Sequence, residues 1–242
     1  MTTTTKATIT FWIVISTVII FDIINYNRNA LLKIERLEPI TIFEPIEIND
    51  FLQDENFSIG DIVQLNNGNV KIDYDPHTDF QTLREIRGIF STHKIYNAED
   101  AVKSLSSVRR IMNIEHLSFV CTKEDIRADK KIFELQQLYN NVLVYGGGFS
   151  VAAKTTGEPL SVQGYYKTGI KLETTPKLTA TDAKNIVKKK DRKNISEIML
   201  VILTVRDGGV HIICWRYHLS WFVNVSGEKY IFIDANTGEI LE

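Results

Sequence analysis

Cysteine is scarce in this chain, whose 242 residues include only Cys121 and Cys214. The two are far apart and belong to no CxxC or finger-like spacing, which excludes a zinc finger and a disulfide-rich scaffold. The sequence allows one bridge between them in an oxidising compartment, or two isolated buried thiols. It therefore leaves the redox state of the pair open.

A strong excess of one charge is also missing. The chain has 28 basic and 30 acidic residues and a formal net charge of -2. Such a balance creates no strong field to attract nucleic acid or an anionic membrane surface. We expect no nucleic-acid partner, and we interpret the basic run at 188–193 (KKKDRK) as a solvated helix end.

The motifs of common catalytic sites are absent. None of the five histidines begins an HExxH motif, in which two His one helical turn apart bind zinc and the Glu acts as base. There is no GxSxG nucleophile elbow. The Gly146-Gly147-Gly148 run lacks the GxGxxG spacing and the Lys-Ser/Thr pair of phosphate-binding loops. We therefore expect a protein that is not an enzyme, with no catalytic residue, cofactor or metal.

The residues that come nearest to a metal cluster are His211, Cys214 and His218. On a helix the three would share one face and, with an outside carboxylate, hold zinc. The surrounding segment 210–225 (VHIICWRYHLSWFVNV) is rich in β-branched and aromatic residues, so it predicts a strand in which His211 faces away from the other two. We favour strand histidines with ordinary hydrogen-bond partners over zinc ligands.

The amino terminus carries one long hydrophobic run. Residues 7–21 (ATITFWIVISTVIIF) are almost wholly apolar, and the run resumes at Ile23 and Ile24. A membrane-spanning helix needs about 20 apolar residues and a signal-peptide core about 7 to 15. No small-x-small cleavage site follows, so for residues 1–26 we favour an uncleaved anchor over a removed signal peptide, with a buried core element as a third reading. Residues 27–60 are interpreted as a stalk that adds an edge strand.

The next segment predicts a β-hairpin. A strand at 62–65 (IVQL) leads through a turn at 66–69 (NNGN) into a strand at 70–74 (VKIDY). A second turn at 75–79 (DPHTD) precedes a strand that ends near 88–90.

Two segments predict helices. Asn97 is suited to cap residues 98–114, whose apolar side chains follow helical spacing, with acidic residues at the start and Arg109 and Arg110 near the end. Thr179 and Thr181 are suited to cap a second helix at 181–190 (TDAKNIVKKK).

Each predicted helix is followed by alternating segments that predict strands. These are 133–139, 142–154 and 160–166 after the first helix, and 197–205, 210–225, 229–235 and 239–242 after the second. The pattern predicts an α+β fold of two tandem subdomains, each an antiparallel sheet backed by a helix, after an N-terminal transmembrane or signal helix.

The first helix and its strands carry a family resemblance. A first strand ends in Gln and an aromatic residue and leads into a short turn. The strand after the turn begins with an apolar pair, an aromatic residue and Gly. Two more glycines follow further along the chain. These positions are Gln137, Tyr139, Asn140, Asn141, Leu143, Val144, Tyr145, Gly146, Gly157 and Gly164. Residues 61–172, and 97–165 most clearly, thereby resemble the fungalysin/thermolysin propeptide (FTP) domain.

The second half of the chain carries another family resemblance. A helix (TATDAKNIVKKK), a central strand (WRYHLSW) and a closing hairpin (YIFIDANTGEIL) occur in that order. The hairpin supplies the most specific positions: Asp234, Ala235, Thr237, Gly238, Glu239 and Ile240. Residues 178–242 resemble a PepSY domain.

The two domains occur together in the propeptides of thermolysin-like metallopeptidases. The resemblance implies a propeptide-like binding module, and without HExxH such a module would inhibit or chaperone a thermolysin-like metallopeptidase in trans. It also implies a membrane-anchored protein, held through residues 7–24 with an extracytoplasmic domain, or a secreted one. Counting positive charges around the apolar run would instead leave the carboxyl-terminal bulk in the cytoplasm. Two alternatives stay open: an envelope structural or ligand-binding PepSY protein unrelated to proteolysis, and a truncated metallopeptidase precursor.

The family-motif residues have structural interpretations. Gly146, Gly164 and Gly238 fit turns, bulges or close backbone approach better than ligand binding. Asp234 is suited to an Asx-turn, in which its carboxylate accepts from the turn amides that follow. We expect any docking surface to use strand edges and exposed aromatics around Tyr139 and Tyr145.

Overall fold

The computed structural model describes residues 45–47, 56–74, 83–190, 195–207, 214–225 and 229–241. These residues form two compact units. Unit 1 contains Asn140–Tyr145 and the described residues from Ile170 onward, and unit 2 contains the described residues up to Tyr139 together with Gly146–Gly169. Strands predominate and the helices are few and short, so the α+β class is confirmed.

The apolar run at 7–24 and most of the stalk lie outside the described residues. Within the described residues, no helix is both long enough and apolar enough to cross a membrane.

Unit 2 contains a sheet in the order β1-β4-β5-β6-β7-β3-β2. Its strands are β1 (Ile46–Glu47), β2 (Lys71–Tyr74), β3 (Leu83–Arg87), β4 (Ser118–Ile126), β5 (Lys130–Tyr139), β6 (Val142–Lys154) and β7 (Pro159–Tyr165). The predicted stalk contributes the short strand β1, which pairs antiparallel with β4. The sequence reading missed β4, because its outer half (TKEDI) is polar and shows no strand-like alternation.

The predicted strand at 62–65 is wrong. Ile59–Leu65 form helix α1, and β2 pairs with β3 in its place. Ser58 is the N-cap: its hydroxyl accepts from the Asp61 N–H at 3.2 Å, and the Asp61 carboxylate accepts from the Ser58 N–H at 2.7 Å. This reciprocal capping box satisfies two helix-end donors, and it outweighs the strand propensity of Ile62 and Val63.

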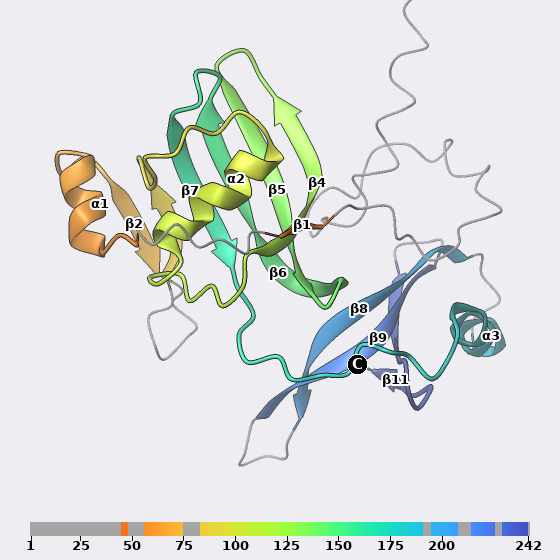
Figure 1. Ribbon diagram of the computed structural model, residues 1–242. Helices are drawn as coiled ribbons and strands as arrows, with labels where there is room; N and C mark the ends of the chain where they lie inside the picture. Colours follow the sequence, from red (N-terminus) through yellow and green to blue (C-terminus); the bar gives the residue numbers. More distant parts are fainter. Residues whose placement is uncertain are drawn as a thin grey trace, which may run out of the picture. The chain divides into compact units, whose positions relative to one another are not determined.

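The predicted first helix is confirmed but is shorter than expected. Asn97 caps it, with its side-chain oxygen accepting from the Asp100 N–H at 2.9 Å. Helix α2 spans Ala98–Ser104, and the chain then tightens into the 3-10 helix η2, Leu105–Val108. In Figure 1 α2 is the yellow helix that lies across the strands of unit 2.

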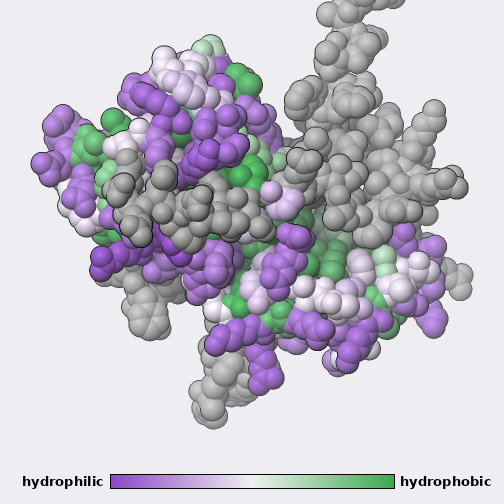
Figure 2. Space-filling model, viewed as in Figure 1, coloured by the Kyte–Doolittle hydropathy of each residue, from purple (hydrophilic) through white to green (hydrophobic). Residues whose placement is uncertain are grey.

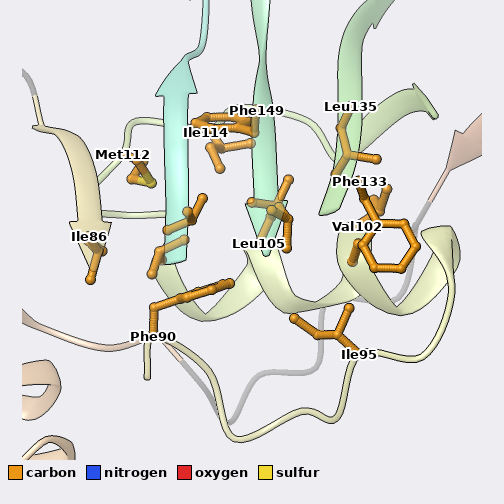
Figure 3. Close-up of a cluster of buried hydrophobic side chains, with 14 of the residues drawn as sticks. Ile86, Phe90, Ile95, Val102, Leu105, Met112, Ile114, Phe133, Leu135 and Phe149 are labelled. Atoms are coloured by element: carbon orange, nitrogen blue, oxygen red, sulfur yellow. The ribbon is translucent and has the colours of Figure 1, made fainter. Parts of the chain in front are cut away.

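The core of unit 2 lies between α2, η2 and the sheet. Phe90, Phe119 and Phe133 are fully buried there. Figure 3 shows how side chains from α2 and η2 (Val102 and Leu105) lie against residues of the strands. Burying each aromatic contributes roughly 1.5–3 kcal/mol, which makes this cluster a main source of the unit's stability.

Unit 1 contains strands β8 (Ile195–Asp207), β9 (Cys214–Val225), β10 (Lys229–Asp234) and β11 (Ile240–Leu241), paired antiparallel in that order. The start of β6 joins this sheet, because Leu143 and Val144 pair in parallel with Val201 and Ile202 of β8. All four strands were predicted from the alternating pattern, with somewhat different ends.

Helix α3 (Ala180–Lys190) packs on β8 and β9. Thr179 caps it, because its hydroxyl accepts from the Asp182 N–H at 3.2 Å while Asp182 accepts from the Thr179 N–H at 2.9 Å. Ala183 and Val187 of α3 are fully buried. The indole N–H of Trp221 on β9 donates to the carbonyl of Leu178 at 3.0 Å, so the odd-numbered face of β9 is the one that α3 covers.

The visible surface of the described residues is largely hydrophilic, with hydrophobic residues in small separate areas (Figure 2). The large hydrophobic side chains that are more than about a third exposed are Ile59, Val63, Tyr74, Tyr96, Ile126 and Tyr230. Only Tyr230 among them stacks on another aromatic ring, that of Phe222.

Candidate functional site

The face of the unit 1 sheet opposite α3 carries a group of four aromatic side chains, which we call the aromatic face: Tyr145, Phe222, Tyr230 and Phe232. Phe222 of β9 and Phe232 of β10 are directly opposed in the antiparallel register, with ring centroids 5.5 Å apart. Strand alternation places them on the even-numbered face, away from Trp221. The sheet thus buries one face under a helix and presents aromatic rings on the other.

Tyr145 reaches this group from β6. Its ring lies 4.9 Å from that of Phe232 in a T-shaped arrangement and 6.1 Å from that of Phe222 in a stacked one. Tyr230 also stacks on Phe222, with ring centroids 5.3 Å apart, and is 38% exposed. Aromatic pairs in these geometries contribute about 0.5–1.5 kcal/mol beyond their buried area, so the rings hold one another in place.

A carboxylate lies on the same face. Glu197 on β8 is opposed to Asn224 of β9, which in turn is opposed to Tyr230 of β10. Burial raises the pKa of Glu197, and a hydrogen bond with the Asn224 side chain offsets only part of that effect. The aromatic face therefore has a polar edge beside its exposed tyrosine.

Asp234 lies at the end of β10, on the same face, and forms the predicted Asx-turn. Its Oδ1 accepts from the N–H groups of Asn236 and Thr237, both at 2.9 Å. Its Oδ2 lies 3.0 Å from Nδ1 of His218, a partner that the sequence did not indicate. Burial raises the pKa of Asp234, but the hydrogen bonds from His218, Asn236 and Thr237 together lower it below its ordinary value.

This His–Asp pair braces the closing hairpin. Both oxygens of Asp234 are occupied by neighbours within the hairpin and β9, and the side chain is 12% exposed. Within the described part of the chain, the His218 ring forms no hydrogen bond with a serine hydroxyl or a cysteine thiol. The arrangement therefore orients the turn and ties it to β9.

Gln137 has a structural role in unit 2. Its side chain is 1% exposed and pairs with the backbone of Lys167 in both directions: Nε2 donates to the carbonyl at 2.9 Å, and Oε1 accepts from the N–H at 2.9 Å. These two hydrogen bonds to the backbone of one residue fix the chain after β7 against β5. Tyr139, at the end of β5, is half-buried and belongs to unit 2, so it is not part of the aromatic face.

Three of the motif glycines, Gly146, Gly164 and Gly238, were expected at turns or close backbone contacts, and all three have a positive φ. Gly164 has φ +150°, and a Cβ there would overlap the carbonyl oxygen of Gly148 across the β6–β7 pair. Gly238 has φ +79°, and a Cβ there would lie 3.1 Å from methyl groups of Ile186 and Leu178. Gly146, with φ +73°, is exposed within β6 and would meet nothing within 4 Å.

The cysteine and metal interpretations have separate outcomes. Cys121 is a free thiol whose Sγ donates to the Lys123 carbonyl at 3.3 Å, and burial raises its pKa to about 11. His211 and the Cys214 side chain lie outside what the structure describes, and His218 is paired with Asp234. Within the described ranges no cluster of three or more potential metal ligands is found.

Sequence reasoning found Tyr145 and Asp234 but missed Phe222, Tyr230, Phe232, Glu197 and His218. Tyr230 and Phe232 alternate within β10, and that spacing was the available signal for a shared face. Their relation to Tyr145 depends on the pairing of β6 with β8, which no local pattern encodes.

No protein-family model matches the chain, and no curated protein sequence matches it. Among solved structures, the C-terminal domain of Bacillus megaterium YpeB is similar, with a TM-score of 0.36 and 15% sequence identity over 78% of this chain and 99% of that one. A similarity at this level is distant, and it assigns neither a family nor an activity to the chain.

Proposed function

We propose that the chain is a non-catalytic binding module that contacts a thermolysin-like metallopeptidase in trans and acts as its inhibitor or folding chaperone. The proposal includes the finer domain assignment, with an FTP-like segment at 61–172 and a PepSY-like segment at 178–242. It rests on the family resemblance and on the structural roles of Gln137, Gly164, Asp234 and Gly238, which hold turns and strand contacts. These motif residues serve to build a shape and leave no reacting group exposed.

The observation that carries the binding role is the aromatic face. Tyrosine and other aromatic residues dominate the energetics of protein interfaces, because they bury a large apolar area at low entropic cost. Tyr230 stacks on Phe222, and it is opposed to Asn224, which forms the polar edge with Glu197. We assign Tyr230 as the anchor of an interface of about 800 Å² per partner, the usual size for protease–inhibitor pairs.

The module acts by occupancy. Covering the rim of a peptidase cleft excludes substrate without any bond being made or broken, so affinity and inhibition fall together when the anchor is lost. We place this module outside the cytoplasm, anchored through residues 7–24 or secreted.

The test uses the full chain in detergent micelles and purified thermolysin-like enzymes. At micromolar concentration the chain slows peptide hydrolysis or raises the yield of refolded enzyme. Tyr230→Ala weakens this effect by about tenfold or more, since truncating a central aromatic anchor typically costs about 2 kcal/mol. Tyr74→Ala is the matched control: Tyr74 is 41% exposed on β2 of unit 2, and its loss leaves the effect unchanged.

Two results would overturn the proposal. One is the absence of both inhibition and refolding assistance across several such enzymes. The other is turnover of a peptide substrate by the purified chain. Inhibition that is equally weakened by Tyr230→Ala and Tyr74→Ala would keep the function but remove the aromatic face from it.

A further inference from the structure

A second site lies in unit 2, on residues that play no part in the proposed function. A pocket of about 510 Å³ is lined by Asn56, Arg109, Arg110, Asn113, Glu115 and Thr168, with the buried side chain of Ile114 beneath them. We call it the arginine pocket. The lining residues come from three separate segments of the chain, which is why no sequence motif indicated it.

Hydrogen bonds fix the walls of this pocket. The Arg109 guanidinium donates from Nε to the carbonyl of Ile114 at 2.9 Å and from Nη2 to that of Glu115 at 2.7 Å. Asn113, with φ +53°, turns the chain back so that these carbonyls face Arg109. The Glu115 carboxylate accepts from the Gly169 N–H at 3.0 and 3.1 Å, which fastens the third segment. The backbone walls of the pocket are therefore held in place before any ligand arrives.

The sequence interpretation of the two arginines changes accordingly. They were expected to complement the dipole of a helix running to residue 114, but α2 ends at Ser104 and η2 at Val108. Arg109 instead clamps the loop that follows. Arg110 is exposed, and its guanidinium forms no ion pair within the described part of the chain.

The residues that line this pocket carry more hydrogen-bond donors than acceptors in their side chains. Asn56 Oδ1 accepts from the backbone N–H of Arg110 at 3.2 Å, an assignment that follows because an N–H can only donate. The Asn56 amide NH₂ takes no part in that bond, and Asn56 and Asn113 line the same pocket as Arg110. Two arginines and one glutamate give the lining a formal charge of +1.

We propose that the arginine pocket binds a peptide carboxylate, either a free carboxyl terminus or an acidic side chain. The planar Arg110 fork matches the two oxygens of a carboxylate, and the amides of Asn56 and Asn113 donate from the sides. A single negative charge balances the lining, whereas a dianionic phosphate would meet the Glu115 carboxylate. Because five of the lining residues named above, all but Arg109, are themselves exposed, the pocket is open enough to admit an extended chain.

Nuclear magnetic resonance titration of the full ¹⁵N-labelled chain tests this. The probes are N-acetyl-trialanine with a free carboxylate, the same peptide amidated, an amidated peptide containing one internal aspartate, and inorganic phosphate. We expect saturable shifts of the backbone amides of residues 109–116 with the free carboxylate or with the aspartate peptide, and none with the neutral amide. Which of the two acidic peptides binds more tightly distinguishes a terminal from a side-chain carboxylate.

Matched arginine variants locate the site. Arg110→Gln weakens peptide binding by roughly tenfold or more, as expected for losing charge-assisted hydrogen bonds. Arg127→Gln removes an exposed arginine that pairs with Asp125 elsewhere in unit 2, and it leaves binding unchanged. If Arg110→Gln changes the amide spectrum as a whole, Asn113→Gly tests the second donor, because glycine removes the amide and keeps the positive φ of this turn.

Several outcomes would overturn the assignment. They are the absence of shifts with both acidic peptides at millimolar concentration, equal shifts with the neutral amide, tighter binding of phosphate than of either peptide, and equal loss in the Arg110 and Arg127 variants. None of these results bears on metallopeptidase inhibition, which is measured separately and relies on Tyr230.

Discussion

At the scale of single residues, Asp234 shows how a charge stabilises this fold. Its hydrogen bonds with His218, Asn236 and Thr237 overcome the effect of burial and lower its pKa from 3.8. A carboxyl group with a lowered pKa in the folded state contributes stability above its unfolded pKa, and that stability is lost as the pH falls through the folded value. We expect Asp234→Asn to lower the free energy of unfolding by about 1–2 kcal/mol at pH near 7. The deficit shrinks below about pH 4, and denaturant unfolding across this range measures it.

The control for this prediction is Asp129→Asn, an exposed carboxylate between β4 and β5. Its substitution changes the free energy of unfolding by no more than about 0.5 kcal/mol at either pH. A deficit in Asp234→Asn that stays constant with pH would contradict a role for the ionised carboxylate, because shape alone does not titrate.

The same residue marks how far sequence reasoning extends. The Asp-x-x-x-Gly pattern at 234–238 predicted the turn, since the atoms that bond are neighbours in the chain. The partner His218 is 16 positions away and depends on the register between β9 and β10. Arg110 and Asn56 are 54 positions apart, so their contact was equally hidden.

At the scale of elements, α1 depends on its cap. Ser58 and Asp61 satisfy each other's backbone N–H groups, and α1 has only 7 residues and one buried side chain, Ile62. A helix this short has little other local stabilisation. We expect Ser58→Ala to speed amide hydrogen exchange in Ile59–Leu65 by about fivefold, because loss of an N-cap costs about 1 kcal/mol.

Ser58→Thr is the matched variant, since threonine retains the accepting hydroxyl and leaves exchange close to that of the natural chain. Equal acceleration in both variants would mean that packing around Ile62, and not the cap, holds the helix. The capping box also explains why the predicted strand at 62–65 was wrong. The letters IVQL favour a strand, and only the Ser-x-x-Asp pattern just before them signals a helix.

At the scale of the whole molecule, the strand predictions were the most successful, because long alternating segments report which face is buried. In unit 1 the predicted helix and four strands are found in order, whereas in unit 2 α1 replaces a predicted strand and β4 was not predicted. What the sequence did not contain was the path of β6, which pairs with β8 through Leu143 and Val144 and continues into unit 2 from Gly146. Parallel pairing between distant segments has no local signature. The aromatic face depends on this pairing, and the arginine pocket depends on contacts between three segments that are far apart in the sequence.

The division into two units leads to a prediction about how the chain unfolds. Each unit has buried side chains of its own, and Val151 on β6 in unit 2 and Val223 on β9 in unit 1 are both fully buried. Val151→Ala and Val223→Ala remove the same two methyl groups, at a cost of about 2 kcal/mol each. If each unit is a separate cooperative body, each variant accelerates hydrogen exchange mainly within its own unit, and mass spectrometry of the full chain resolves the two sets of peptides. Equal acceleration in both units by either variant would show that β6 couples them into one folding body, and the tandem-subdomain description would then be wrong.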